Sequence, residues 1–153
     1  MRKFVSLSRT QTGNKQKRRG AAMVEMAVCF PVFMLMLLGI IEFGRGLMVS
    51  QLLTSAAREG CRSAVIDGST DASVEAEMVT QVVNTVGCTA ADVGISIVVT
   101  SVSDGSVVPL LANADPRDLI DIDVTVSFDS VSFTAGRFLS GQLLRGQCAM
   151  RKE

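Results

Sequence analysis

The side chains that could carry out chemistry are few and unevenly distributed in this sequence. Its 153 residues include no histidine, tryptophan or tyrosine, so the usual general base at neutral pH and the commonest metal ligand are missing. Serine and cysteine nucleophiles have no histidine to activate them, and Lys152 is the only lysine after Lys17. We therefore expect no enzyme activity, no catalytic residue, no cofactor and no small-molecule substrate.

Carboxylates are the next candidates for a site. Glu25 stands inside an apolar stretch, whereas four aspartates gather near residue 120, namely Asp115, Asp118, Asp121 and Asp123. Clustered carboxylates suit Ca²⁺, but this spacing lacks the ligand loop and the bend glycine of a calcium site. We interpret the aspartates as charges on the exposed face of a strand, where they prevent edge pairing, and we predict no metal site.

Four cysteines complete the set of reactive side chains. Cys29 lies in the apolar stretch, and Cys61, Cys88 and Cys148 follow it. In an oxidising compartment two of these three can form one disulfide and leave a spare thiol. The sequence does not choose among the three pairings, and burial as small apolar side chains is an equal alternative.

Charge is asymmetric along the chain although the formal net charge is zero. The first 20 residues contain seven basic side chains and no acidic one, whereas the other 133 contain eight basic and 15 acidic side chains. No aromatic platform or recognition helix accompanies the basic residues, so we expect no nucleic-acid partner. Basic residues before an apolar helix stay in the cytoplasm, and we expect the acidic remainder to be translocated.

An uncharged run at residues 26–41 is the element that must position Glu25. Its 16 residues would rise about 24 Å as a helix, less than the roughly 30 Å of a bilayer core. Adding residues 21–25 gives about 31 Å, so we predict a transmembrane helix over residues 21–45, kinked at Pro31. A carboxylate near the centre of such a helix costs on the order of 2.5 to 3.5 kcal/mol, and somewhat less toward the interface, where Glu25 lies.

Beyond this run the apolar spacing stays helical up to residue 66, where Asp67 and Gly68 supply a stop. At the extracytoplasmic end of the predicted transmembrane helix, Glu42 and Arg45 are one turn apart, which predicts a local ion pair. A second helix is predicted over residues 72–86, capped by Asp71. Alternating apolar and polar residues then predict strands near residues 95–99, 107–108, 120–128 and 144–150.

These elements predict an α+β protein with a long N-terminal helix, a small antiparallel sheet and one additional helix. The sheet needs a cover for its apolar face. The outer half of the first helix is the best candidate because it carries small residues, namely Ala56, Ala57, Gly60 and Ala64. We expect a basic cytoplasmic leader (1–20), the transmembrane helix (21–45), its extracytoplasmic continuation (46–66) and a small extracytoplasmic α+β domain (67–153).

The N-terminal motif narrows this prediction. Basic residues, then Gly20, then an apolar helix with glutamate as its fifth residue are the pattern of type IV prepilins and related prepilin-like proteins. The stretch RRGAAMVEMAVCFPVFMLMLLGIIEFGRG, followed by LLTSAAREGCRSAVIDG and by a terminal strand with CAMRKE, resembles the TadE-like family of tight-adherence (Tad) pilus assembly proteins. The resemblance covers essentially the whole chain after the leader, and its specific part lies between Arg18 and Gly68.

The resemblance implies a pilin-like fold and a non-enzymatic minor pilin or pseudopilin in assembly of a Tad-type pilus. The leader ends in a basic cluster, Lys17, Arg18 and Arg19. A prepilin peptidase would cut between Gly20 and Ala21 and leave the helix in the protein. Glu25 would then pair with the free ammonium of Ala21 on a neighbouring subunit. The implied partners are the membrane, the peptidase, other pilin-like subunits and pilus assembly proteins.

The expected location is the cytoplasmic (inner) membrane, crossed once, with the N-terminus inside and the C-terminal domain outside or in a surface filament. A different class remains open, which is a signal-anchored binding or sensor domain that is never cleaved and never enters a pilus. A membrane-tethered hydrolase is disfavoured by the missing histidines.

Overall fold

The structure is a computed structural model that describes the backbone of residues 13–132 and 138–152, and side chains from Gly20 onward within those ranges. The first helix, α1 (Gly13–Val65), contains Pro31 and begins earlier than the predicted start at Ala21. Lysine, glutamine and arginine, which favour helix, fill most of the added turns. The chain divides into two units at residues 38 and 39, which are described separately below.

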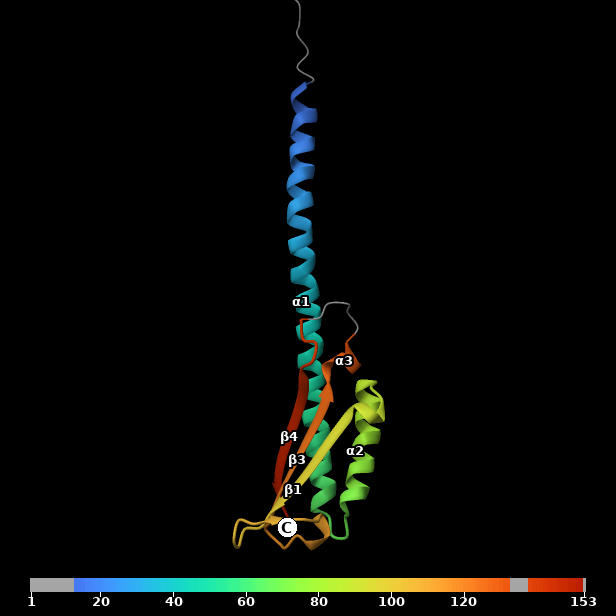
Figure 1. Cartoon of the computed structure of the whole chain (residues 1–153), viewed down its shortest axis with the longest axis vertical. Helices are drawn as coiled ribbons and strands as arrows, with labels where there is room; N and C mark the ends of the chain where they lie inside the picture. Colours follow the sequence, from blue (N-terminus) through green and yellow to red (C-terminus); the bar gives the residue numbers. More distant parts are fainter. Residues whose placement is uncertain (1–12, 133–137, 153) are drawn as a thin grey trace, which may run out of the picture. The chain divides into compact units, whose positions relative to one another are not determined.

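The second unit contains the rest of α1 and all of the remaining elements (Figure 1). They are α2 (Asp71–Val86), the 3₁₀ helix η1 (Ala90–Asp92), β1 (Val93–Thr100), β2 (Val107–Val108), the 3₁₀ helix η2 (Leu111–Asn113), β3 (Leu119–Ser127), α3 (Phe128–Val131) and β4 (Leu143–Arg151). The strands form one antiparallel sheet in the order β2-β1-β3-β4. The predicted α+β class is confirmed.

Strand β3 forms the centre of the sheet, and its side chains alternate as predicted. Ile120, Ile122, Val124 and Val126 are fully buried, while the residues between them are partly exposed. The predicted strand was one residue too long, because Phe128 begins α3. The Phe128 side chain is nevertheless buried, because the core also extends under this short helix.

Helices α1 and α2 cover the apolar face of the sheet. The buried helical residues are Val49, Leu53, Ala56, Ala57, Cys61 and Ala64 from α1, and Val74, Met78, Val82 and Val86 from α2. Two glycines allow the close approach: Gly60 leaves space for the Met78 side chain, and Gly146 of β4 faces the backbone of α1. The predicted packing of the outer half of the first helix against the sheet is thus confirmed.

The N-cap of α2 differs from the prediction. Thr70, and not Asp71, caps this helix, and Thr70 and Ser73 form a reciprocal capping box. Asp71 lies in the first turn, where its carboxylate accepts a hydrogen bond from the backbone N–H of Leu111 at 3.1 Å. The acidic residue therefore holds η2 against α2 instead of capping the helix.

Candidate functional site

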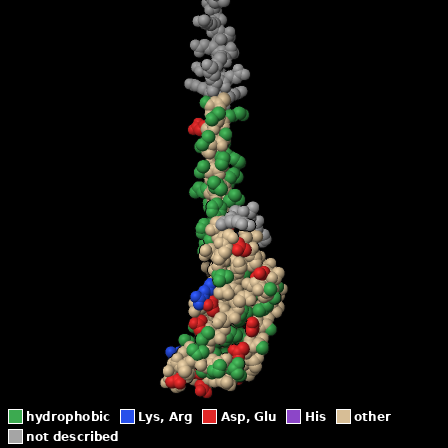
Figure 2. Space-filling model, in the orientation of Figure 1, with side chains coloured by type: hydrophobic (Ala, Val, Ile, Leu, Met, Phe, Trp, Pro, Cys, Tyr) green, Lys and Arg blue, Asp and Glu red, His purple; other side chains and the backbone are tan. Residues whose placement is uncertain are grey.

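The first unit presents an apolar helical surface that the described part of the chain does not cover. Residues 20–38 are exposed except for the half-buried Met34. Apolar side chains occupy most of this surface (Figure 2), including Met23, Val28, Phe30, Phe33, Leu35 and Met36. Soluble monomers seldom expose such a continuous apolar surface. By length and composition this helix could cross a membrane.

Glu25 is the single acidic residue in the described residues 20–38, and it is exposed. Among the described side chains it has no ion-pair partner. A carboxylate in this position is costly in lipid unless a cation or water reaches it. The fold itself supplies no compensation within the described residues, so Glu25 is available to a partner outside them.

Gly20 is a glycine that the fold does not require. A Cβ built on it would meet no atom within 4 Å, and its backbone does not adopt the left-handed conformation that favours glycine. Glycine in a helix is less favourable than alanine by about 1 kcal/mol. The reason for glycine here therefore lies outside the packing of the described residues. The side chains of Lys17, Arg18 and Arg19 lie outside the described residues.

Glu42 and Arg45, which were predicted to pair locally, each contact later segments of the second unit. Glu42 is 1% exposed, and its Oε1 accepts a hydrogen bond from the backbone N–H of Leu139 at 3.4 Å. Arg45 donates to the carbonyl oxygens of Val86 at 3.1 Å and Val131 at 3.3 Å. Among the described residues, the salt bridges do not include a Glu42–Arg45 pair. Both side chains instead fasten α1 to later segments, which helical spacing alone does not reveal.

Two of the four free thiols lie in contact. Cys61 in α1 is fully buried and donates a hydrogen bond to the carbonyl oxygen of Cys148 at 3.2 Å. Burial and, to a smaller extent, the neighbouring Cys148 together raise the pKa of Cys61 to about 12. Cys88 is also buried, which raises its pKa, and Cys29 is exposed on the apolar helix.

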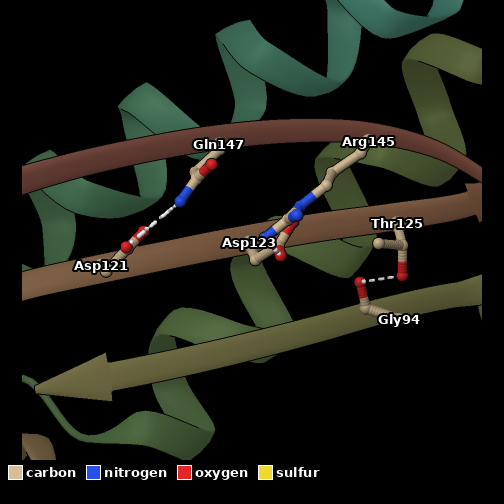
Figure 3. A network of polar contacts seen from close by, with 6 residues as sticks. All are labelled: Gly94, Asp121, Asp123, Thr125, Arg145 and Gln147. Atoms are coloured by element: carbon tan, nitrogen blue, oxygen red, sulfur yellow. Dashed lines mark hydrogen bonds and ion pairs between the residues drawn. The ribbon is translucent and has the colours of Figure 1, made fainter.

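The four aspartates near residue 120 have three different environments, of which the first is the exposed position of Asp115. Asp118 is 3% exposed and accepts hydrogen bonds from the backbone N–H groups of Val102 and Asp115. Asp121 and Asp123 point to the outer face of the sheet, where they contact Gln147 and Arg145 of β4 (Figure 3). Asp123 lies opposite Gln147 in the register, so the ion pair with Arg145 is diagonal.

This arrangement corrects the interpretation that these charges prevent edge pairing. Strand β3 is central and is paired on both sides, so its aspartates protect no free edge. Side chains of the neighbouring strand bind them instead: Arg145 forms an ion pair with Asp123, and the Gln147 amide donates a hydrogen bond to Asp121. In the part of the chain that the structure describes, no group of three histidine, cysteine or acidic residues could hold a metal ion.

The comparison with protein families bears directly on the exposed helix. Residues 20–62 match the model of the family described as TadE: TadE-like protein. The chain carries a TadE-like segment. The match begins at Gly20 and includes Glu25, Glu42, Arg45 and Cys61, whereas residues 63–153 lie outside it. No curated protein and no solved structure matches the chain.

This match confirms the predicted resemblance to the TadE-like family over residues 20–62, whereas the expected resemblance over the rest of the chain is not found. The match also includes most of the apolar helix that by length and composition could cross a membrane. The matched residues belong to both units, because the match extends along α1 from the exposed helix into the part that packs on the sheet.

Proposed function

We propose that this protein is a minor pilin or pseudopilin that takes part in assembly of a Tad-type pilus through protein contacts. The observation that carries the proposal is the exposed apolar helix of residues 20–38, interrupted by Glu25, within a segment that matches the TadE-like family. Such a surface suits a bilayer before assembly and the helices of other subunits afterwards.

In this proposal a prepilin peptidase cuts between Gly20 and Ala21 and leaves α1 attached to the head. Support comes from the position of Gly20 at the start of the family match and from the absence of a packing reason for glycine there. The basic cluster of Lys17, Arg18 and Arg19 keeps the leader on the cytoplasmic side. Residues 46–153, in which acidic side chains outnumber basic ones, are then exported.

Glu25 takes the role of the pairing residue between subunits. Cleavage creates an ammonium group at Ala21, and the Glu25 carboxylate of a neighbouring copy pairs with it. Two unit charges about 4 Å apart attract by about 4 kcal/mol at an effective dielectric constant of 20, before the cost of removing water is deducted. The pair therefore sets the register of neighbouring helices more than it stabilises them.

The second unit is the exported head of the subunit in this proposal. Glu42 and Arg45 follow the apolar segment in α1, and their side chains form hydrogen bonds with backbone groups of later segments of the head. The head supplies surfaces for other pilus proteins and needs no catalytic group for this role.

The experiment that tests the proposal is determination of the N-terminus of the protein extracted from membranes, with and without a prepilin peptidase in the cell. We expect a chain that begins at Ala21 when the peptidase is present and at Met1 when it is absent. A chain that begins at Met1 in both cases would support an uncleaved signal anchor. Shearing the cells then distinguishes a filament subunit, released with the filaments, from a subunit that stays in the membrane.

A further inference from the structure

Two thiols meet at the interface between α1 and β4. Cys61 and Cys148 are 87 positions apart in the sequence, yet the Cys61 thiol donates a hydrogen bond to the Cys148 carbonyl oxygen at 3.2 Å. Cys148 also raises the pKa of the Cys61 thiol, and its side chain is partly buried against the same core. Gly146, on the same face of β4, lies against the backbone of Leu53. The two cysteines therefore meet at a closely packed helix–strand interface.

The other two cysteines occupy different places. Cys88 follows the end of α2, and the charged group that affects its pKa is Asp92 and not a thiol. Cys29 lies on the exposed apolar helix of the first unit. Of the three pairings that the sequence left open, the structure brings together the thiols of one, Cys61 with Cys148.

We propose that Cys61 and Cys148 form a disulfide bond in the exported protein, and that this bond fastens the last strand to the first helix. The proposal rests on the export of the second unit in the proposed function, because cytoplasmic thiols stay reduced. The oxidant is a disulfide of the exported compartment, carried by a thiol oxidase or a small molecule.

The reaction is a pair of thiol–disulfide exchanges. The Cys148 thiolate first attacks the oxidant's disulfide, which releases one oxidant sulfur as a thiolate and leaves a mixed disulfide on Cys148. The Cys61 thiolate then attacks the Cys148 sulfur and releases the second oxidant sulfur. The two cysteines together lose two electrons and two protons, and the oxidant gains both.

The difference in burial sets the order of these steps. Cys148 is half-buried, whereas Cys61 is fully buried. Burial also keeps Cys61 protonated at neutral pH, because it raises the pKa of this thiol to about 12, and a protonated thiol is a poor nucleophile. Cys148 is therefore the entry point for the oxidant. Cys61 reacts either while the head is still folding or during a local opening of the interface.

The bond would enclose most of the head, including α2 and strands β1 to β3. Closing a long loop restricts the unfolded chain strongly, so a sizeable gain in stability is expected. The disulfide would also connect the TadE-like segment to the strand that ends the sheet, since Cys61 lies inside residues 20–62. A force applied to α1 would then be transmitted to β4 through the covalent disulfide bond.

Peptide mapping of the full chain from membranes tests the pairing. Cells are quenched with acid, free thiols are alkylated under denaturing conditions without reductant, and the protein is digested with trypsin. Cys61 then lies in the peptide EGCR, residues 59–62, and Cys148 in GQCAMR, residues 146–151. We expect these two peptides joined by a disulfide, with Cys88 alkylated. Alkylation of both peptides, or a link from either one to Cys88, would overturn the proposal.

Variants separate this proposal from the proposed function. Cys61→Ser and Cys148→Ser should each remove the linked peptide and lower the melting temperature of the oxidised protein by about 5 °C or more, whereas the matched control Cys88→Ser should retain the link. If a serine variant does not fold, the wild-type peptide map still decides. The N-terminus of the same sample is read in parallel. Free thiols on a chain that begins at Ala21 overturn the disulfide alone, and a linked peptide on a chain that begins at Met1 overturns the processing alone.

Discussion

Gly146 of β4 lies so close to α1 that a Cβ on it would overlap the peptide bond between Leu53 and Thr54. The helix backbone cannot move aside without disturbing the buried Leu53 side chain. Only glycine therefore allows the strand and the helix to pack at this distance. The contact makes β4 part of the same core as α1, and it lies on the face of β4 that also holds Cys148.

We predict that Gly146→Ala destabilises the head by about 2 to 3 kcal/mol because of overpacking. For a chain of this size the melting temperature should fall by roughly 5 to 10 °C, measured by circular dichroism on the detergent-solubilised protein. Gly94→Ala is the matched control, because the one atom that its Cβ would crowd is the Thr125 hydroxyl oxygen, which can rotate away. Equal melting temperatures for the two variants would contradict the packing argument.

Gly20→Ala or any larger substitution should abolish cleavage of the leader. The fold cannot explain such a loss, because a Cβ at Gly20 meets no atom within 4 Å and alanine favours the helix by about 1 kcal/mol. Mass spectrometry of the membrane-extracted protein measures the outcome. Gly39→Ala, a second uncrowded helical glycine, should be processed normally. Normal processing of both variants would show that Gly20 is not required for cleavage of the leader.

Glu25→Gln should be cleaved normally but should assemble poorly. The change removes the negative charge and makes membrane insertion easier, so a defect in assembly would report the lost pair with the Ala21 ammonium. We expect a decrease of about tenfold or more in crosslinked neighbours, equivalent to about 1.4 kcal/mol. Glu25→Asp keeps the charge and should assemble better than the glutamine variant. If the Glu25→Gln variant forms as many crosslinked neighbours as the wild-type protein, the proposed pair between Glu25 and the Ala21 ammonium is refuted.

Asp118→Ala should destabilise the loops at the β2 end of the sheet. Its buried carboxylate accepts hydrogen bonds from Val102 at 3.1 Å and Asp115 at 2.9 Å, and its removal leaves both donors unpaired. A loss of about 2 to 3 kcal/mol is expected, measured by urea unfolding. Asp104→Ala, on an exposed turn, should have a much smaller effect because water replaces its contacts with Ser106. Similar midpoints for the two variants would argue against the buried role of Asp118.

The reduced protein should lose stability at alkaline pH. Burial raises the pKa of Cys61 from 9.0 to about 12, so the contribution of the neutral thiol is complete below pH 9 and decreases as the pH rises toward 12. The melting temperature in reductant should fall over this interval. The fall should be smaller for Cys61→Ser, which does not titrate there. Parallel pH profiles for wild type and variant would show that Cys61 does not contribute.

Local patterns were sufficient to predict most elements of the fold. Apolar residues at every second position, namely Ile120, Ile122, Val124 and Val126, predicted the central strand, because one face of such a strand is buried and the other is exposed to solvent. The small residues Ala56 and Gly60 predicted a helix face for close packing. The ends of elements were less predictable, since Phe128 continues the alternation but already belongs to α3.

The sequence by itself determined the apolar helix, the position of Glu25 and the TadE-like motif, because each depends on residues that are neighbours along one helix. Only the tertiary structure decided which cysteines meet, where Glu42 and Arg45 find their partners, and why Gly146 must be glycine. These contacts join residues that are 41 to 97 positions apart. Such pairs are selected by how the helix and the sheet pack in three dimensions, and no local periodicity encodes that choice.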